Sequence, residues 1–316
     1  MIMLRKFCFA AMAAVAAVSC CEKDVVLPEH EAEGELVTFS VSVPGLETKS
    51  TGDTDEKNVN SLQVIVFNKN GVYEASSYGR GTALSLTCTT GEKRMLALVN
   101  CNMEEGLANF DEFAARQLLL KDSGPGDLVM LGDSTLTVVN NKPINLDVEY
   151  LSSKIVLESV TLNMYNQQHK QLPFAIKSVF LTNVAGDRLY VNESEPTTWY
   201  HQDRYDKQNT LPFLYDSLAE GQALADGDTY ETPHYFYCYP NQTSTKTRLV
   251  IEAEIGGQTY YYPIIVNKVL PNNQYSYNVV LTRLGVDSPD ANLDRSAYTV
   301  RITMKDWKSN SSIVEI

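Results

Sequence analysis

The chain has 316 residues, of which 44% are hydrophobic and 21% charged, and its formal net charge at pH 7 is −13. This composition is typical of a globular protein and excludes a disordered chain, and the length corresponds to about two domains. The negative charge and the lack of a Lys/Arg cluster argue against nucleic-acid binding, which needs basic side chains against phosphates. The 18 tyrosines and the runs of Thr, Val and Tyr favour β structure.

Residues 1–19 form a predicted export signal. Arg5 and Lys6 precede an apolar run over 7–18, which is too short for a permanent membrane helix. The run ends in small residues before Cys20 and so resembles a bacterial lipoprotein signal, with Cys20 as the lipidated residue and new N-terminus. An ordinary cleaved secretory signal is the alternative. In both cases residues 1–19 are excluded from the fold.

A predicted strand and an exposed loop follow the signal. The strand has alternating apolar residues, which is typical of one buried face, at Val37, Phe39, Val41 and Val43. After Pro44-Gly45 the chain is polar and lacks periodicity as far as Asn60, which predicts a loop. Lys49, followed by Ser50, is placed in this loop where a protease could reach it.

Short strands then follow in quick succession. Apolar runs between turn residues predict strands at 62–67, 83–88, 94–100, 128–131, 135–139 and 144–148. We expect 83–88 and 94–100 to form a hairpin, and Gly132-Asp133-Ser134 to be a tight turn. One helix is predicted at 107–120, because its apolar residues recur at three- and four-residue spacing.

A second series of strands begins near residue 154. It is predicted at 155–162, 175–182, 235–239, 248–255, 259–266, 275–282 and 297–304. Gly256-Gly257 predicts a two-residue hairpin, and the polar stretch 190–228 is interpreted as a long insertion. Many short strands at regular spacing predict an all-β fold with a minor helix, built as two tandem β-sandwich domains over 50–148 and 149–316.

The sequence offers no recognisable active site, and we predict no enzyme, no cofactor and no metal site. The histidines are too far apart for a local metal motif, and residues 200–206 around His201 are interpreted as a solvated loop. Gly132-Asp133-Ser134 resembles the GDS block of one esterase family, but the only candidate partner, His234, lacks the required preceding aspartate. Three cysteines are expected to be buried free thiols: Cys88, Cys101 and Cys238.

The C-terminal end is a half-buried strand with an apolar tail. Its apolar residues alternate at Tyr298, Val300, Ile302 and Met304. After Trp307 the chain is polar until the apolar residues Ile313, Val314 and Ile316. Such β-prone ends without an evident partner in their own sequence favour pairing with another chain.

Taken in this order, these motifs resemble the major fimbrial subunit (fimbrillin) family of Bacteroidales, the pilins of type V pili. The resemblance covers nearly the whole chain, and the common order of individually weak motifs carries it. The motifs are the start at Cys20, TKS (48–50), DEKNV (55–59), LQVIVFN (62–68), TGEKR (90–94), TYYYPIIVN (259–267), PNNQYSY (271–277) and DW (306–307).

The resemblance implies how the chain is exported, processed and assembled. It implies transthyretin-like sandwich domains, export as a lipoprotein to the outer membrane, and cleavage by a trypsin-like protease that removes residues 20–49. The cut would fall between Lys49 and Ser50, although well-known relatives are cut after arginine. A neighbouring subunit would then insert its C-terminal segment after Trp307 as a donor strand, so that other fimbrial subunits are the expected partners in an extracellular fimbrium for adhesion or biofilm formation.

Three alternatives stay open. The chain could be the tip or anchor subunit of the fimbrium, or a surface glycan-binding lipoprotein. A glycan-binding lipoprotein would use exposed tyrosines to stack on sugars, with candidates at Tyr235, Tyr237, Tyr239 and 260–262. The simplest alternative is that residues 33–49 are the first strand of a stable sandwich and are never cut.

Overall fold

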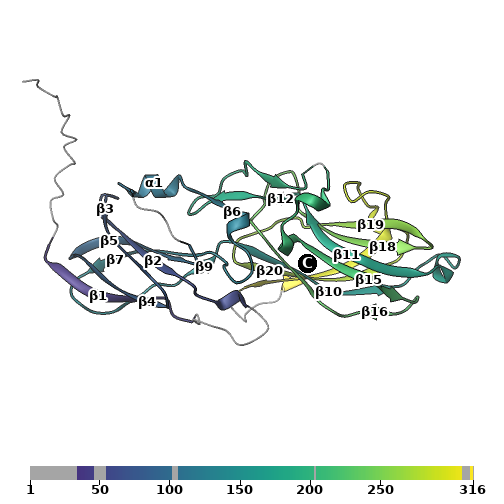
Figure 1. Ribbon diagram of the computed structural model, residues 1–316, viewed down its shortest axis with the longest axis horizontal. Coiled ribbons are helices and arrows are strands. Elements are labelled where there is room, and N and C mark those ends of the chain that lie inside the picture. Colours follow the sequence, from purple (N-terminus) through teal and green to yellow (C-terminus); the bar gives the residue numbers. More distant parts are fainter. Residues whose placement is uncertain (1–33, 46–54, 102–105, 203, 308–313, 316) are drawn as a thin grey trace, which may run out of the picture. The chain divides into compact units, whose positions relative to one another are not determined.

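The computed structural model describes residues 34–45, 55–101, 106–202, 204–307 and 314–315, and every structural statement below concerns these residues. Strands, short 3-10 turns and one α-helix make up their regular structure, so the predicted all-β fold with a minor helix is confirmed (Figure 1). Among these residues, no helix has the length and apolar character needed to cross a membrane. Cys20, Lys49, Ser50, Ile313 and Ile316 lie outside the described residues.

Residues 36–150 form two sheets. The first has the order β4-β1-β8 and consists of β1 (Leu36–Ser42), β4 (Ala83–Thr89) and β8 (Ile144–Asn145). The second has the order β3-β2-β5-β7-β9 and consists of β2 (Leu62–Asn68), β3 (Tyr73–Gly79), β5 (Gly91–Val99), β7 (Met130–Val138) and β9 (Glu149–Tyr150). All their pairs are antiparallel except that of β1 with β8.

One buried apolar cluster joins these two sheets into a sandwich. Phe39 and Val41 of β1 belong to the same cluster as Val64 of β2 and Met95 of β5. The alternate residues of β2, such as Ile65, are buried in a second cluster on the other face of the sheet. Strands covered on both faces read as continuous apolar runs, which explains why residues 62–67 are apolar without alternation.

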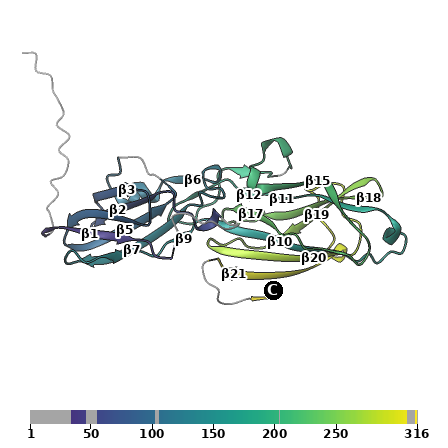
Figure 2. The same ribbon diagram turned by 60° about the horizontal axis from the view of Figure 1, so that its bottom comes forward.

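Residues 153–315 form a second pair of sheets, seen in Figure 2. One has the order β16-β10-β20-β21-β22, with β17 also beside β10; its strands are β10 (Ser153–Leu162), β16 (Thr229–Tyr230), β17 (His234–Cys238), β20 (Asn273–Leu281), β21 (Tyr298–Asp306) and β22 (Val314–Glu315). The other has the order β15-β11-β18-β19, with β11 (Phe174–Thr182), β15 (Tyr215–Leu224), β18 (Arg248–Ile255) and β19 (Gln258–Ile265). The two pairs of sheets correspond to the two predicted sandwiches, and the domain limits 50–148 and 149–316 stay a prediction.

Short elements complete the fold. Two small pairs are β6 (Gln117–Leu119) with β13 (Asp187–Leu189), and β12 (Val184–Ala185) with β14 (Trp199–Tyr200). The 3-10 turns are η1 (Asp55–Lys57), η2 (Leu120–Asp122), η3 (His169–Gln171), η4 (Lys207–Asn209), η5 (Pro212–Leu214) and η6 (Arg295–Ala297). The stretch 190–228, interpreted above as an insertion, thus contains β15, which pairs with β11 and belongs to a main sheet.

The predicted hairpin between 83–88 and 94–100 is wrong. β4 pairs with β1, whereas β5 pairs with β2 and β7 in the other sheet. The chain passes from one sheet to the other at Gly91, whose φ of 121° is a conformation that favours glycine. The turn signal was therefore correct, but it marks a change of sheet.

The predicted tight turn at Gly132-Asp133-Ser134 is also wrong, because β7 runs through these residues without interruption. A Cβ atom on Gly132 would lie 2.3 Å from the carbonyl oxygen of Asp147. Glycine is needed here because another backbone approaches the strand closely, which is a second common reason for glycine in a strand.

The helix is shorter than predicted. α1 spans Phe110–Ala114, and its N-cap Asn109 accepts a hydrogen bond from the Glu112 N–H at 3.0 Å. Residues beyond it leave the helical path, because Leu118 lies in β6 and pairs with Arg188 of β13. Phe113 and Leu118 are both buried, but they belong to different elements, so their spacing imitated a single helix face.

Candidate functional site

β1 fills a position between two strands that are far from it in the chain. We call the position that β1 occupies, between β4 and β8 and against the facing sheet, the β1 slot. Figure 1 shows β1 and β4 side by side. All seven residues of β1 pair antiparallel with β4, from Leu36 opposite Thr89 to Ser42 opposite Ala83. β8 pairs with β1 in parallel over two residues only. The β1 slot is therefore formed mainly by the edge of β4.

The apolar face of β1 holds it in the slot. Phe39, Val41 and Val43 are 3%, 0% and 1% exposed, and Val37 is half-buried, so the predicted alternation is confirmed. Burial of these side chains contributes on the order of 5 to 9 kcal/mol at about 1.5 to 3 kcal/mol for each fully buried residue. A whole domain is stable by about 5 to 15 kcal/mol, so the loss of β1 would remove much of the stability of its sandwich.

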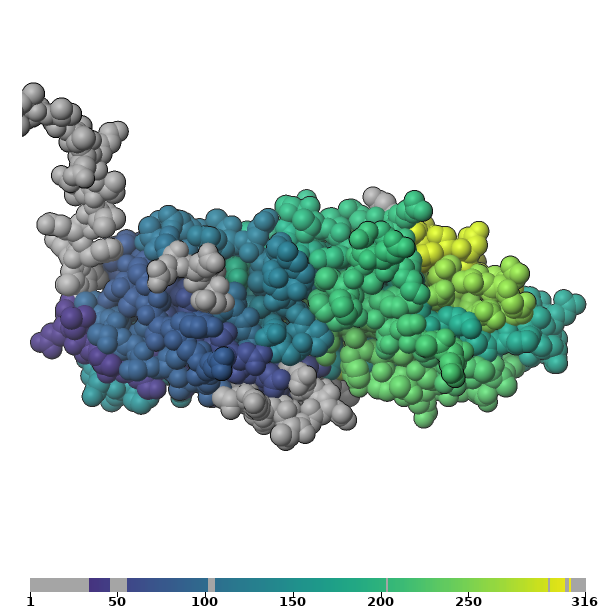
Figure 3. Space-filling view, viewed as in Figure 1, coloured from purple at the N-terminus to yellow at the C-terminus, as the bar shows by residue number. Residues whose placement is uncertain are grey.

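Polar contacts of β1 lie on its outer face, and Figure 3 shows this part of the chain, coloured purple, at the molecular surface. The hydroxyl oxygens of Thr38 and Thr87 are 2.7 Å apart, and the Ser42 hydroxyl donates to Asn145 Oδ1 at 2.6 Å. Exposed hydrogen bonds add little net stability, because water competes for the same groups. The β1 slot therefore holds a strand through backbone hydrogen bonds to β4 and through alternate apolar side chains. Another strand with the same apolar pattern could also supply these contacts.

A buried ion pair fastens the end of β4. Lys93 is fully buried in β5, with its Nζ 2.6 Å from Glu74 Oε2 and 2.8 Å from Thr89 Oγ1. Glu74 Oε1 in turn accepts from the N–H and the hydroxyl of Thr89, the last residue of β4. Burial raises the pKa of Glu74, but the hydrogen bonds from Lys93 and Thr89 outweigh it and hold the pKa below its usual value. The pair thus ties one wall of the β1 slot to the opposite sheet.

A Glu74→Gln variant should lose about 2 kcal/mol of the free energy of unfolding at pH 7, because the buried Lys93 ammonium would lose its carboxylate partner. The pKa of Glu74 is lower in the folded state than its ordinary 4.5, so this contribution is present above pH 4.5 and is lost as the pH falls through the folded pKa. Urea unfolding at several pH values measures both effects. Glu92→Gln, an exposed neighbour in β5, is the control, and a difference that does not shrink in acid would contradict the assignment.

The predicted C-terminal donor residues lie in the other half of the chain. Trp307 is half-buried directly after β21, and Val314 of β22 pairs with Met304 of β21. β21 itself pairs with β20. In this structure the described C-terminal strands therefore complete their own sheet, and Trp307 packs against the buried cluster that includes Phe39 and Val41 of β1.

Three of the six candidate sugar-stacking tyrosines are buried, and Tyr260 and Tyr261 are half-buried. Tyr237 and Tyr239 are buried, and their hydroxyls donate to Glu56 Oε1 at 2.6 Å and to the Leu119 carbonyl at 3.2 Å. Tyr262 is also buried and donates to the Arg283 carbonyl at 2.9 Å, whereas Tyr235 is 47% exposed. The alternating tyrosines of β17 are explained by sheet packing, with Tyr235 as the outward residue.

The residues that resemble an esterase site are not brought together. Ser134 lies in β7 opposite Met95. His234 Nδ1 is 2.6 Å from Asp216 Oδ2, and its Nε2 is 3.0 Å from the Tyr230 hydroxyl. Both ring nitrogens are thus engaged with residues other than Ser134.

His201 corrects the interpretation of residues 200–206 as a solvated loop. Its side chain is buried, its Nδ1 accepts from the Asp206 N–H at 3.2 Å, and its ring packs against Tyr205. Burial lowers the pKa of His201 despite the nearby carboxylates of Asp206 and Asp290. No group of three or more His, Cys, Asp or Glu side chains within the described ranges could hold a metal ion.

The three thiols of the described chain are free, as predicted. Cys88 and Cys238 are buried, and burial raises the pKa of Cys88 to about 11 and that of Cys238 to about 12. Cys101 is only half-buried, and its Sγ lies 3.0 Å from the Tyr190 hydroxyl. Thiols with raised pKa values are poor nucleophiles, which agrees with a structural role.

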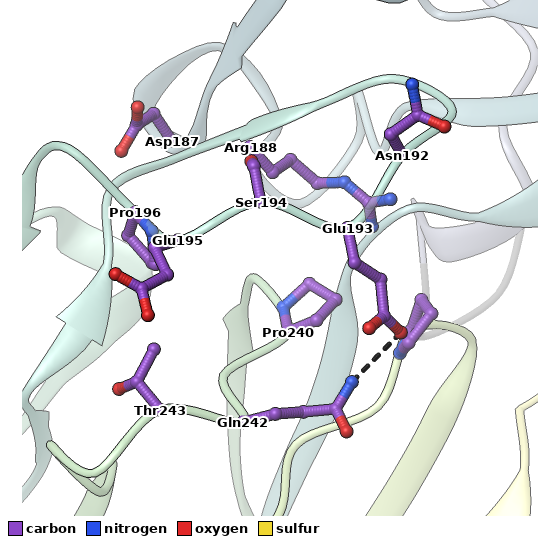
Figure 4. Close-up of a pocket in the computed structure, with 11 residues that line it drawn as sticks. Asp187, Arg188, Asn192, Glu193, Ser194, Glu195, Pro196, Pro240, Gln242 and Thr243 are labelled. Atoms are coloured by element: carbon purple, nitrogen blue, oxygen red, sulfur yellow. Dashed lines mark hydrogen bonds between the residues drawn. The ribbon is translucent and has the colours of Figure 1, made fainter.

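A surface pocket of about 310 Å³ lies beside β13 (Figure 4). Its charged side chains serve the local fold: Asp187 accepts four hydrogen bonds from Thr197 and Thr198, and Arg188 donates to the Leu151 and Leu189 carbonyls. Glu193 accepts from Gln242 at 3.0 Å, as the dashed line in Figure 4 shows. These groups fasten the loop after β13, and we assign no ligand to them.

Comparison with known families gives a match for part of the chain. Residues 38–173 match the family model of the Major fimbrial subunit protein (FimA). The match begins inside β1 and ends just before β11, and it confirms the resemblance noted in the sequence. No curated protein sequence matches the chain.

Solved structures share the fold across most of this chain. A putative cell adhesion protein from Bacteroides eggerthii DSM 20697 is 19% identical, with a TM-score of 0.65 over 87% of this chain and 97% of that chain. A fimbrilin (fimA) from Porphyromonas gingivalis W83 is 16% identical, with a TM-score of 0.62 over 86% and 97%. The tip fimbrial protein Mfa3 from Porphyromonas gingivalis is 13% identical, with a TM-score of 0.54 over 86% and 99%. At these identities the likeness shows the fold.

Proposed function

We propose that this chain, whose residues 38–173 match the major fimbrial subunit (FimA) family, is a structural subunit of an extracellular fimbrium and not an enzyme. The observation that carries the proposal is β1, the first strand of the described chain, which fills the β1 slot through an apolar face. A first strand can be removed without cutting the chain between the strands that follow it. The β1 slot would then be open to a strand from another subunit, in a fimbrium that supports adhesion or biofilm formation.

The proposal includes export and maturation. Lipid on Cys20 would hold the precursor at the outer membrane, and a trypsin-like protease would cut between Lys49 and Ser50. The described chain leaves the β1 sheet at Gly45 and resumes with η1 at Asp55, so a cut at residue 49 falls between two structured elements. It would separate β1 from the rest of the chain without cutting within any later strand, and β4 and β8 would lose the strand with which they pair.

The pattern of apolar residues indicates which segment could replace β1. The tail after Trp307 has Val314 and Ile316 at alternate positions, whereas β1 and Val43 present four apolar residues at that spacing. β21 has four such residues, at Tyr298, Val300, Ile302 and Met304. We therefore extend the proposed donor to β21 together with the tail.

β21 is also less deeply buried than β20, the strand with which it pairs. The inward residues of β20, including Tyr277 and Val279, are buried, whereas Val300 and Ile302 of β21 are only half-buried. Strands with little buried apolar surface open at low free-energy cost. The sheet could thus release β21 while β10 and β20 keep its core covered.

A stalk subunit agrees better with this end of the chain than a tip subunit does. A stalk subunit must both accept and donate a strand, and the chain has a slot at its start and a β-prone segment at its end. One of the structures compared above is a tip fimbrial protein with the same fold, so the fold alone does not distinguish these roles.

Limited trypsin digestion of the chain lacking residues 1–20 tests the proposal. The product should begin at Ser50 and should form a ladder of multimers that is visible without boiling in detergent. Lys49→Ala should abolish both results, because it removes the proposed cleavage site. Lys57→Ala, an exposed lysine at the other end of the same loop, is the matched control and should change neither. A product that begins elsewhere, or a cut protein that stays monomeric, would contradict the proposal.

A further inference from the structure

A single carboxylate contacts three other elements. Glu56 lies in η1, and its Oε1 accepts from Lys154 Nζ of β10 at 2.5 Å and from the Tyr237 hydroxyl of β17 at 2.6 Å. Its Oε2 accepts from the indole N–H of Trp307 at 3.0 Å. We call Glu56, Lys154, Tyr237 and Trp307, together with Tyr150, the Glu56 cluster. It is the point at which η1, β10, β17 and the end of β21 meet.

The ion pair at the centre of the cluster is buried. Glu56 is 9% exposed and Lys154 is 5% exposed. Burial raises the pKa of Glu56, but the hydrogen bonds from Lys154, Tyr237 and Trp307 outweigh it, so the pKa stays below its usual value. A buried carboxylate that accepts several charge-assisted or polar hydrogen bonds strongly favours the geometry that provides them. Glu56 therefore favours the position of Trp307 seen here.

Aromatic packing holds the same tryptophan. The Trp307 ring stacks on Tyr150 with ring centres 4.2 Å apart, and it lies 5.7 Å from the ring centre of Tyr237. Its backbone N–H donates to the Asn272 carbonyl at 2.9 Å, which continues the ladder between β21 and β20. Trp307 is thus the anchored end of β21, directly before the tail.

Glu56 lies on the side of the proposed cut that remains in the mature chain. It comes six residues after Ser50, so it would stay in the subunit after β1 is removed. The backbone carbonyl of Glu56 also accepts from the Tyr150 hydroxyl at 3.0 Å. The start of the mature chain and the end of β21 are therefore fixed to the same residue.

We propose that Glu56 is a latch, a positioning residue that holds β21 on its own subunit through Trp307. The functional part of this inference rests on the proposed function, in which β21 belongs to the donor. Release of β21 takes the indole N–H away from a buried carboxylate and unstacks the ring from Tyr150. Both losses oppose the departure of β21 from a subunit that has no neighbour to receive it.

Hydrogen–deuterium exchange of the uncut protein tests the latch without any assembly step. In Glu56→Gln the amides of β21 should exchange about tenfold faster or more, relative to the amides of β11 in the same protein. Trp307→Phe keeps a stacking ring but lacks the N–H donor, so it should give a smaller increase. It also keeps the test valid if Glu56→Gln, which leaves Lys154 unpaired, does not fold. Glu74→Gln removes a carboxylate from the other buried lysine pair and should leave the ratio unchanged.

The outcomes separate the two proposals. The latch is supported if β21 exchanges faster relative to β11 in Trp307→Phe, and in Glu56→Gln if that variant folds, while Glu74→Gln leaves the ratio of the two exchange rates unchanged. The latch is overturned if this ratio is unchanged in Trp307→Phe and in a folded Glu56→Gln. It is also overturned if Glu74→Gln raises the ratio equally. A trypsin-cut wild type that never forms multimers overturns the proposed function and leaves the exchange result standing. Where the wild type does assemble, cut Trp307→Phe should assemble faster, and an equal rate would show that the contact does not restrain donation.

Discussion

A Val41→Asp variant should lose about 4 kcal/mol of the free energy of unfolding, measured by urea denaturation of the uncut protein. Val41 has no exposed surface and lies in the middle of β1, in the cluster that joins the two sheets. A carboxylate at this position would either lose its hydration or draw β1 out of the slot. The expected loss is a large part of the contribution of β1 to the stability of its sandwich.

Ser40→Asp is the control for this substitution, because it introduces the same side chain on the exposed face of the same strand. It should change the free energy of unfolding by less than about 0.5 kcal/mol. The uncut Val41→Asp precursor should also form multimers without trypsin, since its slot is no longer firmly occupied. If the two variants cost the same, β1 is not held by its apolar face, and the strand-replacement proposal fails.

A synthetic peptide of residues 34–45 should keep cut subunits monomeric when it is added in excess after the released fragment has been removed. The peptide carries the seven residues that pair with β4 and the side chains of Phe39, Val41 and Val43. It should therefore compete with the donor strand for the β1 slot. Size-exclusion chromatography of the cut protein, with and without peptide, measures the result.

The required peptide concentration follows from opposing free energies. Apolar burial supplies on the order of 5 to 9 kcal/mol, and the backbone ladder adds to it. Association of two molecules costs about 4 to 15 kcal/mol in lost freedom, so we expect a dissociation constant on the order of micromolar or weaker. The same peptide with Val41→Asp is the control. Equal inhibition by both peptides, or by neither, would mean that the β1 slot does not recognise this pattern.

The sequence predicted those features that depend on neighbouring residues. The alternation over Val37, Phe39, Val41 and Val43 is local and correctly predicted both the strand and its buried face. The partner of that strand could not be predicted from the sequence. β4 follows 40 residues or more later in the chain, and its apolar pattern would suit pairing with β1 or with β5. The wrong hairpin between β4 and β5 has this origin, since a turn signal does not say whether the chain stays in the same sheet.

Among the charged residues of the site, the sequence indicates the buried lysines but not their carboxylate partners. Lys93 and Lys154 occupy buried positions within strands, and a lysine among inward-facing residues is a readable sign of a buried carboxylate partner. The partners Glu74 and Glu56 give no such sign. Glu56 lies in the charged stretch DEKN, which is indistinguishable from a solvated loop until Lys154 and Trp307 are seen beside it. The sequence therefore predicted β1 and its buried face, but not Glu56, which contacts Trp307 at the end of β21.

The location of β1 and β21 in different sheets has a consequence for the proposed filament. The proposed accepting surface lies in the β4-β1-β8 sheet, and the proposed donor lies in the sheet of β10 and β20. Contacts between two different surfaces are heterologous and repeat in one direction, instead of closing into a symmetric pair. A growing fibre would thus have two chemically distinct ends. A precursor that keeps β1 could give its strand to a neighbour but receive none, so it would stop growth at one end and leave the other end free to extend.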